Sequence, residues 1–301
     1  MSIEARAYRE GLRGHPRLGP DTLGEMSAGR YLWMLRRRVL GPERVITKEH
    51  VVALGRSTAL RLRSRSKVRA LLLRELALGP PRHARIVVGD ARVELGGGAD
   101  FPVDWKAFVE VFAEQPYAGP YRQARVLDVG AHKGYFGAYA LAHGASVVLS
   151  VEPEARNYEA LARAAGPLGD RWLTRNAAVG STSGTGTLLL DRTSWAHSLL
   201  QVERPAGEQQ VEMVTLEQAL SDLPAGGSRT IVKIDAEGSE CDILSRPYAL
   251  TPIDLLVVEW HTGAPCTRDQ LIRAVESSGL LAMPASDGLM RFARGGVPRQ
   301  A

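Results

Sequence analysis

The sequence contains little of what marks an exported, membrane-spanning or fibrous protein. Its two cysteines, Cys241 and Cys266, have no second Cys or His at metal-ligand spacing, so we expect reduced thiols with a structural role. No apolar run reaches the roughly 18–20 residues of a membrane span, and the chain begins without the apolar stretch of a secretory signal. Hydrophobic residues make up 45% and charged residues 24%, which excludes collagen, coiled-coil arrays and wholly disordered chains. We therefore expect a cytoplasmic globular protein.

Positive charge is concentrated in the N-terminal quarter of the chain. Residues 1–75 hold 17 Lys and Arg against 7 Asp and Glu, a net charge of +10, whereas residues 76–301 carry −5. Because Arg supplies 33 of the 38 basic residues, part of this excess reflects genome composition. We expect the basic segment to contact an acidic carrier protein or a second copy of the chain. Nucleic acid is the weaker interpretation, because aromatic stacking residues are sparse there.

The pattern of apolar residues divides the chain into two parts. Residues 1–120 are expected to form a mostly helical extension: helical periodicity covers 31–40 and 57–78, an alternating pattern predicts a β-hairpin over 84–96, and Asp104 begins a short helix. Residues 121–301 alternate strands with helices, which is typical of a parallel sheet with helices on both faces. We predict strands in RVLDVGA, SVVLSVEP, WLTRNAAVG, TIVKIDAEGSE, DLLVVEWHTG and LMRFARGG, with an additional strand after Gly184 and a short one before a helix that Thr215 caps.

A glycine-containing turn follows the first strand of this second part. In VLDVGAHKG, Asp128 ends the strand, and Gly130 and Gly134 flank His132 before the next helix. Glycines here let a ligand approach backbone N–H groups near the positive end of the helix. The spacing differs from the G-x-G-x-x-G of dinucleotide folds, and the acid suits the amino-acid end of S-adenosylmethionine better than a pyrophosphate. A purely structural turn is the alternative.

Polar residues also end the next two strands. Glu152 lies 24 residues after Asp128, where a carboxylate can accept both hydroxyls of a ribose. Asn176 and Ala177 end the strand after that, where an adenine is expected. The alternatives are a helix-dipole partner for Glu152 and an ordinary turn residue for Asn176.

A third group of polar residues is KIDAEGSE, in which Asp235, Glu237 and Glu240 follow a buried strand. Three acids beside a ligand crevice are costly unless they bind something or cap the next helix. With VLDVGAHKGYF, VEPE, AAVG, VTLEQAL and VVEWH in the same order, this segment resembles the FkbM family of S-adenosylmethionine-dependent methyltransferases over residues 125–261. The chain has His132 where the family commonly has Asn.

The resemblance implies a Rossmann-like class I methyltransferase sheet and methyl transfer to a hydroxyl of a small molecule such as a sugar or secondary metabolite. It implies that the cofactor is contacted by six residues of the first two motifs, by Asn176 and Ala177 of the third strand segment, and by Asp235. The six are Asp128, Gly130, His132, Gly134, Phe136 and Glu152.

Methyl transfer to an alcohol needs a base, and four side chains are candidates. Asp235 and Glu237 follow one strand, and Glu259 and His261 follow the next. His261 has a suitable ordinary pKa near 6.5, while a carboxylate needs a raised pKa or a water relay. The carboxylates can also hold a divalent cation, although we do not expect a metal. An RNA methyltransferase that uses the basic segment, or a nucleotide-binding domain without catalysis, are the competing functions.

Overall fold

The computed structural model describes the second part of the chain almost completely and short pieces of the first. The described residues are 50–54, 58–62, 84–88, 91–95, 104, 107–108, 110–191, 196–200, 202, 205–261, 264–285 and 288–295. The helix expected over 31–40 lies outside these residues. The division at residue 120 stays a prediction.

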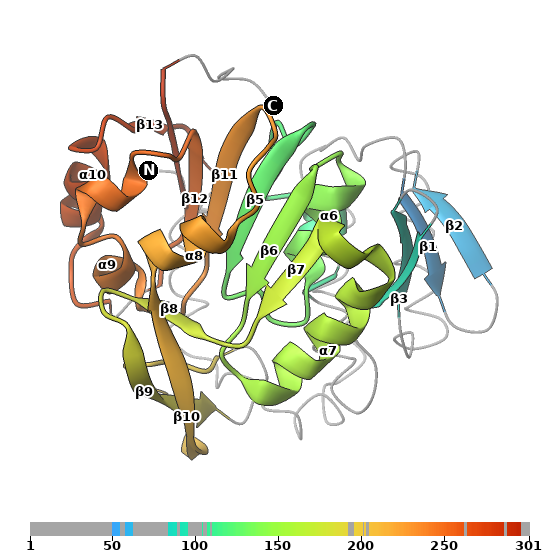
Figure 1. Cartoon of the computed structure of the whole chain (residues 1–301), viewed down its shortest axis with the longest axis horizontal. Coiled ribbons are helices and arrows are strands. Elements are labelled where there is room, and N and C mark those ends of the chain that lie inside the picture. Colours follow the sequence, from blue (N-terminus) through green and yellow to red (C-terminus); the bar gives the residue numbers. More distant parts are fainter. Residues whose placement is uncertain are drawn as a thin grey trace, which may run out of the picture. The chain divides into compact units, whose positions relative to one another are not determined.

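A seven-stranded sheet organises the described residues (Figure 1), and its strand order is β13-β14-β12-β11-β5-β6-β7. Strands β5, β6, β7, β11 and β12 are mutually parallel, and β14 pairs antiparallel with both β12 and β13. The strands are β5 (Ala124–Val129), β6 (Val147–Val151), β7 (Trp172–Arg175), β11 (Arg229–Ile234), β12 (Leu255–Glu259), β13 (Leu281–Met283) and β14 (Leu289–Ala293). This order is the expected Rossmann-like sheet. The chain passes from β5 to β6 on one side and places β11 on the other, so the strand order reverses at β5, and ligands of open α/β sheets bind at the carboxyl ends of the strands at such a point.

Helices cover both faces of this sheet. On one face, apolar side chains of α8, α9 and α10 pack with those of β5, β6, β11 and β12 into a single core. On the other face, α6 lies against β5 and β6, and the Trp172 indole donates a hydrogen bond to Ser150. The helical elements are η1 (Glu110–Glu114), α6 (Tyr135–Ala142), α7 (Ala155–Ala165), η2 (Gly166–Arg171), α8 (Leu216–Asp222), α9 (Glu240–Ile243), η3 (Pro247–Leu250) and α10 (Arg268–Glu276).

The sequence determines where two of these helices begin. Thr215 accepts a hydrogen bond from the backbone N–H of Gln218, whose side chain accepts one from the Thr215 N–H, and Thr267 and Gln270 repeat this arrangement before α10. Each such capping box satisfies two N–H groups that the helix itself leaves unpaired. The predicted helix beginning at Thr215 is confirmed.

The segment WLTRNAAVG was predicted as one strand, and this was wrong. It forms two strands in different sheets: β7 ends at Arg175, and β8 (Ala178–Gly180) joins a three-stranded sheet with β9 (Gly184–Asp191) and β10 (Pro205–Thr215). The Asn176 side chain donates to the backbone oxygens of Glu152 and Pro153, and this fixes the chain where it turns out of the large sheet. Strand β10 is also longer than expected, because it pairs along β9.

The extension contains a four-stranded sheet of order β2-β1-β3-β4. Its strands are β1 (His50–Leu54), β2 (Thr58–Leu62), β3 (Ala84–Val88) and β4 (Ala91–Leu95). The predicted hairpin is confirmed as β3 and β4, but Thr58–Leu62, expected to begin a helix, is a strand. Ala59 and Leu60 are adjacent apolar residues, so TALRL lacks the alternation of a strand, and its antiparallel pairing with β1 overrides a local preference for helix.

The prediction of two reduced thiols was wrong as well, because Cys241 and Cys266 form a disulfide with Cα atoms 5.9 Å apart. Cys241 lies in α9, the helix that follows β11 after a short turn, and Cys266 lies in the loop after β12. Since β11 and β12 are parallel neighbours, their carboxyl ends meet at the same edge of the sheet. Spacing along the chain does not reveal this proximity.

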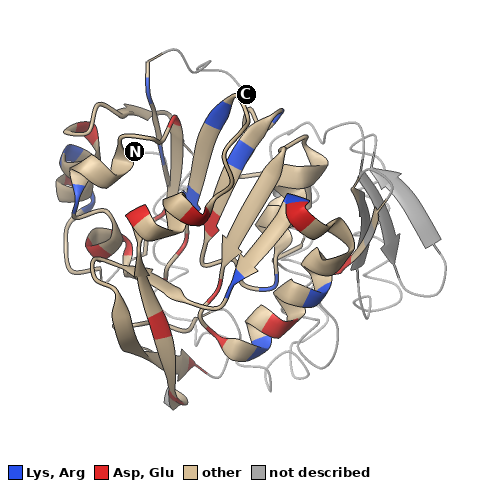
Figure 2. Ribbon diagram, viewed as in Figure 1, with Lys and Arg blue, Asp and Glu red and all other residues tan. Residues whose placement is uncertain are grey.

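Charge is interleaved on the helices that surround the sheet. Figure 2 shows basic and acidic residues along both α7 and α10, and Arg163 pairs with Glu159 one turn away on α7. In the part of the chain that the structure describes, each helix is too short or too polar to cross a bilayer. Most of the basic N-terminal quarter lies outside the described residues, so the partners expected for it stay predictions.

Candidate active site

The candidate site lies at the carboxyl ends of β5, β6, β11 and β12. The turn after β5 approaches the end of β11 so closely that a Cβ on Gly130 (φ +69°) would lie 1.8 Å from the Asp235 carbonyl oxygen. A Cβ on Gly134 (φ +90°) would lie 2.8 Å from side-chain atoms of Leu161 and Trp172. The chain's own packing therefore requires both glycines, in addition to any approach by a ligand.

Glu152 connects this turn to the end of β6. One oxygen accepts from the His132 N–H at 2.8 Å, and the other accepts from the Glu154 N–H at 3.0 Å. Burial raises the pKa of Glu152 to about 7, although these hydrogen bonds oppose the rise. The Asn176 amide nitrogen is bonded to the Glu152 backbone oxygen at 2.8 Å. The predicted cofactor residues thus lie together, and several of them hold one another in place.

Three other predicted cofactor residues are buried in the protein. Asp128 is fully buried, and its burial raises its pKa, while Lys233 and Ser150 lower it. Phe136 is 3% exposed and lies edge-on against Tyr117, with ring centroids 5.3 Å apart. Ala177 is also fully buried, in the core under the sheet. Their contacts with a cofactor stay predictions.

Lys233 is a buried charged residue that was not predicted to belong to the site. Its ammonium group lies 3.4 Å from Asp128 and 3.2 Å from Asp235, and it donates to the Gly130 carbonyl oxygen at 3.0 Å. It thereby joins the carboxyl ends of β5 and β11. A lysine within the otherwise apolar strand TIVKI was the signal available in the sequence.

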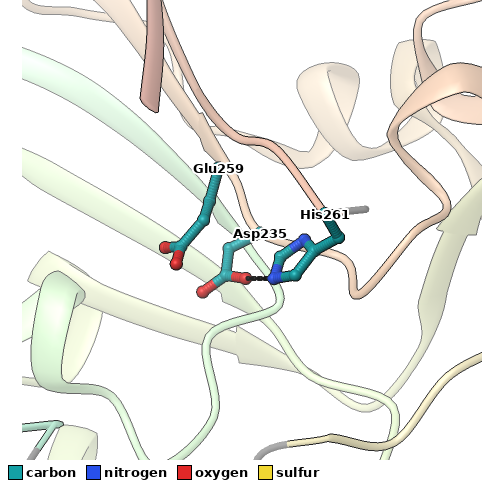
Figure 3. Close-up of side chains that lie close together, drawn as sticks. All are labelled: Asp235, Glu259 and His261. Atoms are coloured by element: carbon teal, nitrogen blue, oxygen red, sulfur yellow. Dashed lines mark ion pairs between the residues drawn. The ribbon is translucent and has the colours of Figure 1, made fainter. Parts of the chain in front are cut away.

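Asp235, Glu259 and His261 gather at the ends of β11 and β12 (Figure 3). Nε2 of His261 lies 3.7 Å from Asp235 Oδ1 and 3.5 Å from Glu237 Oε2. Its Nδ1 lies 2.9 Å from Oε1 of Glu240, whose side chain is fully buried. The structure therefore brings the four predicted catalytic side chains together and adds Glu240 beneath them.

The charges and burial in this cluster raise the pKa values of His261, Glu237 and Glu259. Burial alone would lower the pKa of His261, but the hydrogen bond to Glu240 and the charges of Glu237 and Asp235 raise it to about 10. Burial and the charge of Asp235 raise the pKa of Glu237 to about 8. The charge of Asp235 and burial raise the pKa of Glu259 to about 7. At neutral pH His261 is a cation, and Glu259 is poised to accept a proton.

Asp235, Glu259 and His261 offer ligand atoms within 4.8 Å of one another, a grouping that can hold a metal ion. A protonated imidazole has no lone pair for a metal, however, and its positive charge already faces two of the carboxylates. While His261 is protonated, it therefore offers no ligand atom to a metal ion.

A tyrosine from before β5 also reaches the cluster. The Tyr117 hydroxyl donates to Glu259 Oε2 at 2.6 Å. Tyr117 could not be predicted as a site residue, because nothing in the pattern around it indicates that its loop lies against a strand residue 142 positions away.

A family model for the methyltransferase FkbM domain matches residues 128–275. No curated protein sequence matches the chain. Among solved structures, an FkbM methyltransferase from Methylobacillus flagellatus aligns at 14% identity and TM-score 0.41, covering 62% of this chain and 47% of its own. The chain thus spans about half the length of that protein.

Two further solved structures align at similar levels. A protein in the NADB-Rossmann superfamily from Streptococcus agalactiae aligns at 12% identity and TM-score 0.35, over 60% of this chain and 66% of its own. A ribosomal protein L11 methylase from Lactobacillus delbrueckii subsp. bulgaricus aligns at 15% identity and TM-score 0.34, over 66% of this chain and 81% of its own. These similarities are weak, so the fold assignment rests on the strand order, and the family assignment on the match over 128–275. The match identifies residues 128–275 as a domain of the FkbM family of S-adenosylmethionine-dependent methyltransferases.

Proposed function

We propose that this protein transfers a methyl group from S-adenosylmethionine to a hydroxyl of a small molecule, such as a sugar or a secondary metabolite. The observation that carries this proposal is the position of Glu259, a carboxylate with a pKa near 7 at the edge where the predicted cofactor residues meet the acidic cluster. A base with a pKa close to the working pH is the group that an alcohol acceptor requires.

The residues at this edge fit a positively charged methyl donor. Asp235 keeps about a quarter of its side-chain surface exposed, so its carboxylate can face a sulfonium or ammonium group. We expect Glu152, which accepts from the His132 N–H in the glycine turn, to bind the ribose. S-adenosylmethionine supplies an electrophilic methyl group on sulfur.

We assign the base to Glu259. In the transfer, the acceptor oxygen forms a bond to the methyl carbon as the carbon–sulfur bond breaks, and the hydroxyl proton passes to Glu259. His261 is the weaker candidate, because with a pKa near 10 it already holds a proton at neutral pH. Glu237, with a pKa of about 8, is mostly protonated there. Positively charged His261 instead stabilises the negative charge of Asp235, whose Oδ1 lies 3.7 Å from Nε2.

We expect the reaction to need no divalent cation, because the imidazolium of His261 supplies positive charge among these carboxylates. Turnover that survives dialysis against EDTA supports this expectation. Loss of turnover that Mg²⁺ restores would contradict it. A small-molecule acceptor, a cytoplasmic location and a contact of the basic N-terminal segment with an acidic carrier protein or a second copy are further parts of the proposal.

The experiment that tests the donor is thermal unfolding with S-adenosylmethionine, S-adenosylhomocysteine or NAD. A ligand at about 100 times its Kd stabilises by roughly 2.7 kcal/mol, which raises Tm by several degrees. We expect a rise with the first two ligands and none with NAD, and a smaller rise in Glu152→Gln than in the exposed control Glu159→Gln. A rise with NAD alone, or none with any ligand, would overturn the proposed function.

A further inference from the structure

Tyr117 reaches the site from a loop that precedes the matched family domain. The residue is 4% exposed, and its ring packs edge-on against Phe136 of α6. The ammonium group of Lys233 lies 6.0 Å from the centroid of the same ring. The side chain therefore lies between helix α6 and the buried charges at the strand ends.

The loop that carries Tyr117 is fixed from two directions. The guanidinium of Arg291, on β14, donates to the carbonyl oxygens of Ala118 at 2.7 Å and Pro116 at 2.6 Å. The hydroxyl of buried Tyr121 donates to the Tyr117 carbonyl oxygen. The backbone is bonded on both sides of Tyr117 and its ring packs against Phe136, so the direction of the side chain is restricted.

That direction is toward Glu259. The hydroxyl of Tyr117 donates to Oε2 at 2.6 Å. We therefore expect Oε1 to be the oxygen that receives the proton of the methyl-accepting hydroxyl. Burial and the neighbouring carboxylates raise the pKa of Tyr117 well above its usual value, so the phenol stays protonated and donates at every pH at which the enzyme works.

The other charged groups that face Glu259 come from three elements. Asp235, after β11, and Glu110, on η1, disfavour the ionised carboxylate, while Lys233, on β11, favours it. Glu237, in the turn after β11, is a further carboxyl group that interacts with Glu259. Tyr117 is the neutral donor among these groups, and a donor to a carboxylate favours its charged form.

We infer that Tyr117 is a positioning residue of the active site, which holds Oε2 of Glu259 so that the carboxylate is ionised and its other oxygen faces the acceptor hydroxyl. The inference rests on the proposed role of Glu259 as the base. It extends the functional site to a segment outside residues 128–275, because the loop before β5 supplies a contact that the family domain does not contain.

The test is a titration of Glu259 in the whole protein without ligands, by NMR of protein carrying ¹³C-labelled glutamate carboxyl groups. The Glu259 resonance is the one missing in Glu259→Gln. Tyr117→Phe removes only the hydroxyl, so we expect the Glu259 pKa to rise by roughly one unit. Tyr139→Phe, which also removes a buried hydroxyl, should leave it unchanged. A Tyr117→Phe value equal to that of the unsubstituted protein would overturn the inference.

A second measurement separates this inference from the proposed function. With an acceptor in hand, Tyr117→Phe should lower kcat about tenfold below pH 6 and approach the unsubstituted rate above pH 9, because Glu259 is then ionised in both proteins. A merely structural role would lower the rate equally at all pH values and would contradict the inference. If the NMR shift appears but Glu259→Gln retains full turnover, Tyr117 still orients Glu259 and the assignment of the base is what fails.

Discussion

A single carboxylate oxygen of Glu240 holds His261: Oε1 lies 2.9 Å from Nδ1 of the imidazole. The same oxygen accepts hydrogen bonds at 3.2 Å from the N–H groups of Ala236 and Gly238. These N–H groups flank Glu237, whose φ of +48° is uncommon for a residue with a side chain. One buried oxygen of Glu240 thus fixes both the turn after β11 and the imidazole of His261, which lies shortly after β12.

We expect Glu240→Gln to lower the pKa of His261 by at least one unit. The variant keeps an oxygen for the backbone N–H groups but removes the negative charge that favours the imidazolium. NMR titration of the His261 ring measures the effect, and the exposed Glu159→Gln is the matched control. An unchanged pKa would mean that Asp235 and Glu237 alone keep His261 charged.

Stability should fall as the pH rises from 7 to 9. The folded-state pKa of His261, about 10, exceeds its unfolded value of about 6.5, so its contribution is complete below pH 6.5 and is lost as the pH approaches 10. Glu237, with a pKa near 8, acts in the same direction up to that pH. His143 and His197 have lowered pKa values, so they change the stability only below about pH 6.5.

The expected loss over this window is about 2 kcal/mol for His261. Urea unfolding at pH 7, 8 and 9 measures it, and His261→Gln should flatten the dependence. A free energy of unfolding that rises with pH over this range would contradict the cluster as described.

Glu259→Gln should lower the rate of methyl transfer by roughly 10²–10⁴-fold, since it removes the base and keeps the shape of the side chain. Formation of S-adenosylhomocysteine in the presence of a hydroxylated acceptor measures the rate. The Tm rise with S-adenosylmethionine should persist, because the predicted cofactor residues are intact. Equal turnover in Glu259→Gln and in the surface variant Glu212→Gln would assign the base elsewhere.

Opening the disulfide should destabilise the folded protein. It closes a loop across a sequence separation of 25 residues, and restricting a loop of this length in the unfolded chain is worth roughly 3 kcal/mol. We expect the double variant Cys241→Ser, Cys266→Ser to lose about this much, measured by urea unfolding without reductant. If the unsubstituted protein is as stable with dithiothreitol as without it, the bridge contributes nothing.

The order of strands and helices from Ala124 onward could be predicted because periodicity is local. The pattern that predicts each buried strand or capped helix lies within about ten residues of sequence. The gathering of Asp235, Glu237, Glu259 and His261 also followed from the sequence, since parallel strands place their carboxyl ends at one edge.

The contacts that could not be predicted join segments far apart in the chain. Tyr117 meets Glu259, Arg291 holds the loop at 116–118, and Cys241 bonds Cys266. The strand Thr58–Leu62 likewise depends on its pairing with β1. None of these has a local pattern that distinguishes it from an ordinary loop, thiol or helix.

The disulfide makes the segment that carries Glu259 and His261 a covalently closed ring, from Cys241 through η3 and β12 to Cys266. A protease that cuts once within this ring, for example in the loop after His261, would leave both halves attached to each other. Such nicked protein would run as a full-length chain in a non-reducing gel and separate into two fragments only after a thiol is added. The strand that bears the candidate base is therefore retained in the molecule even when its backbone is broken.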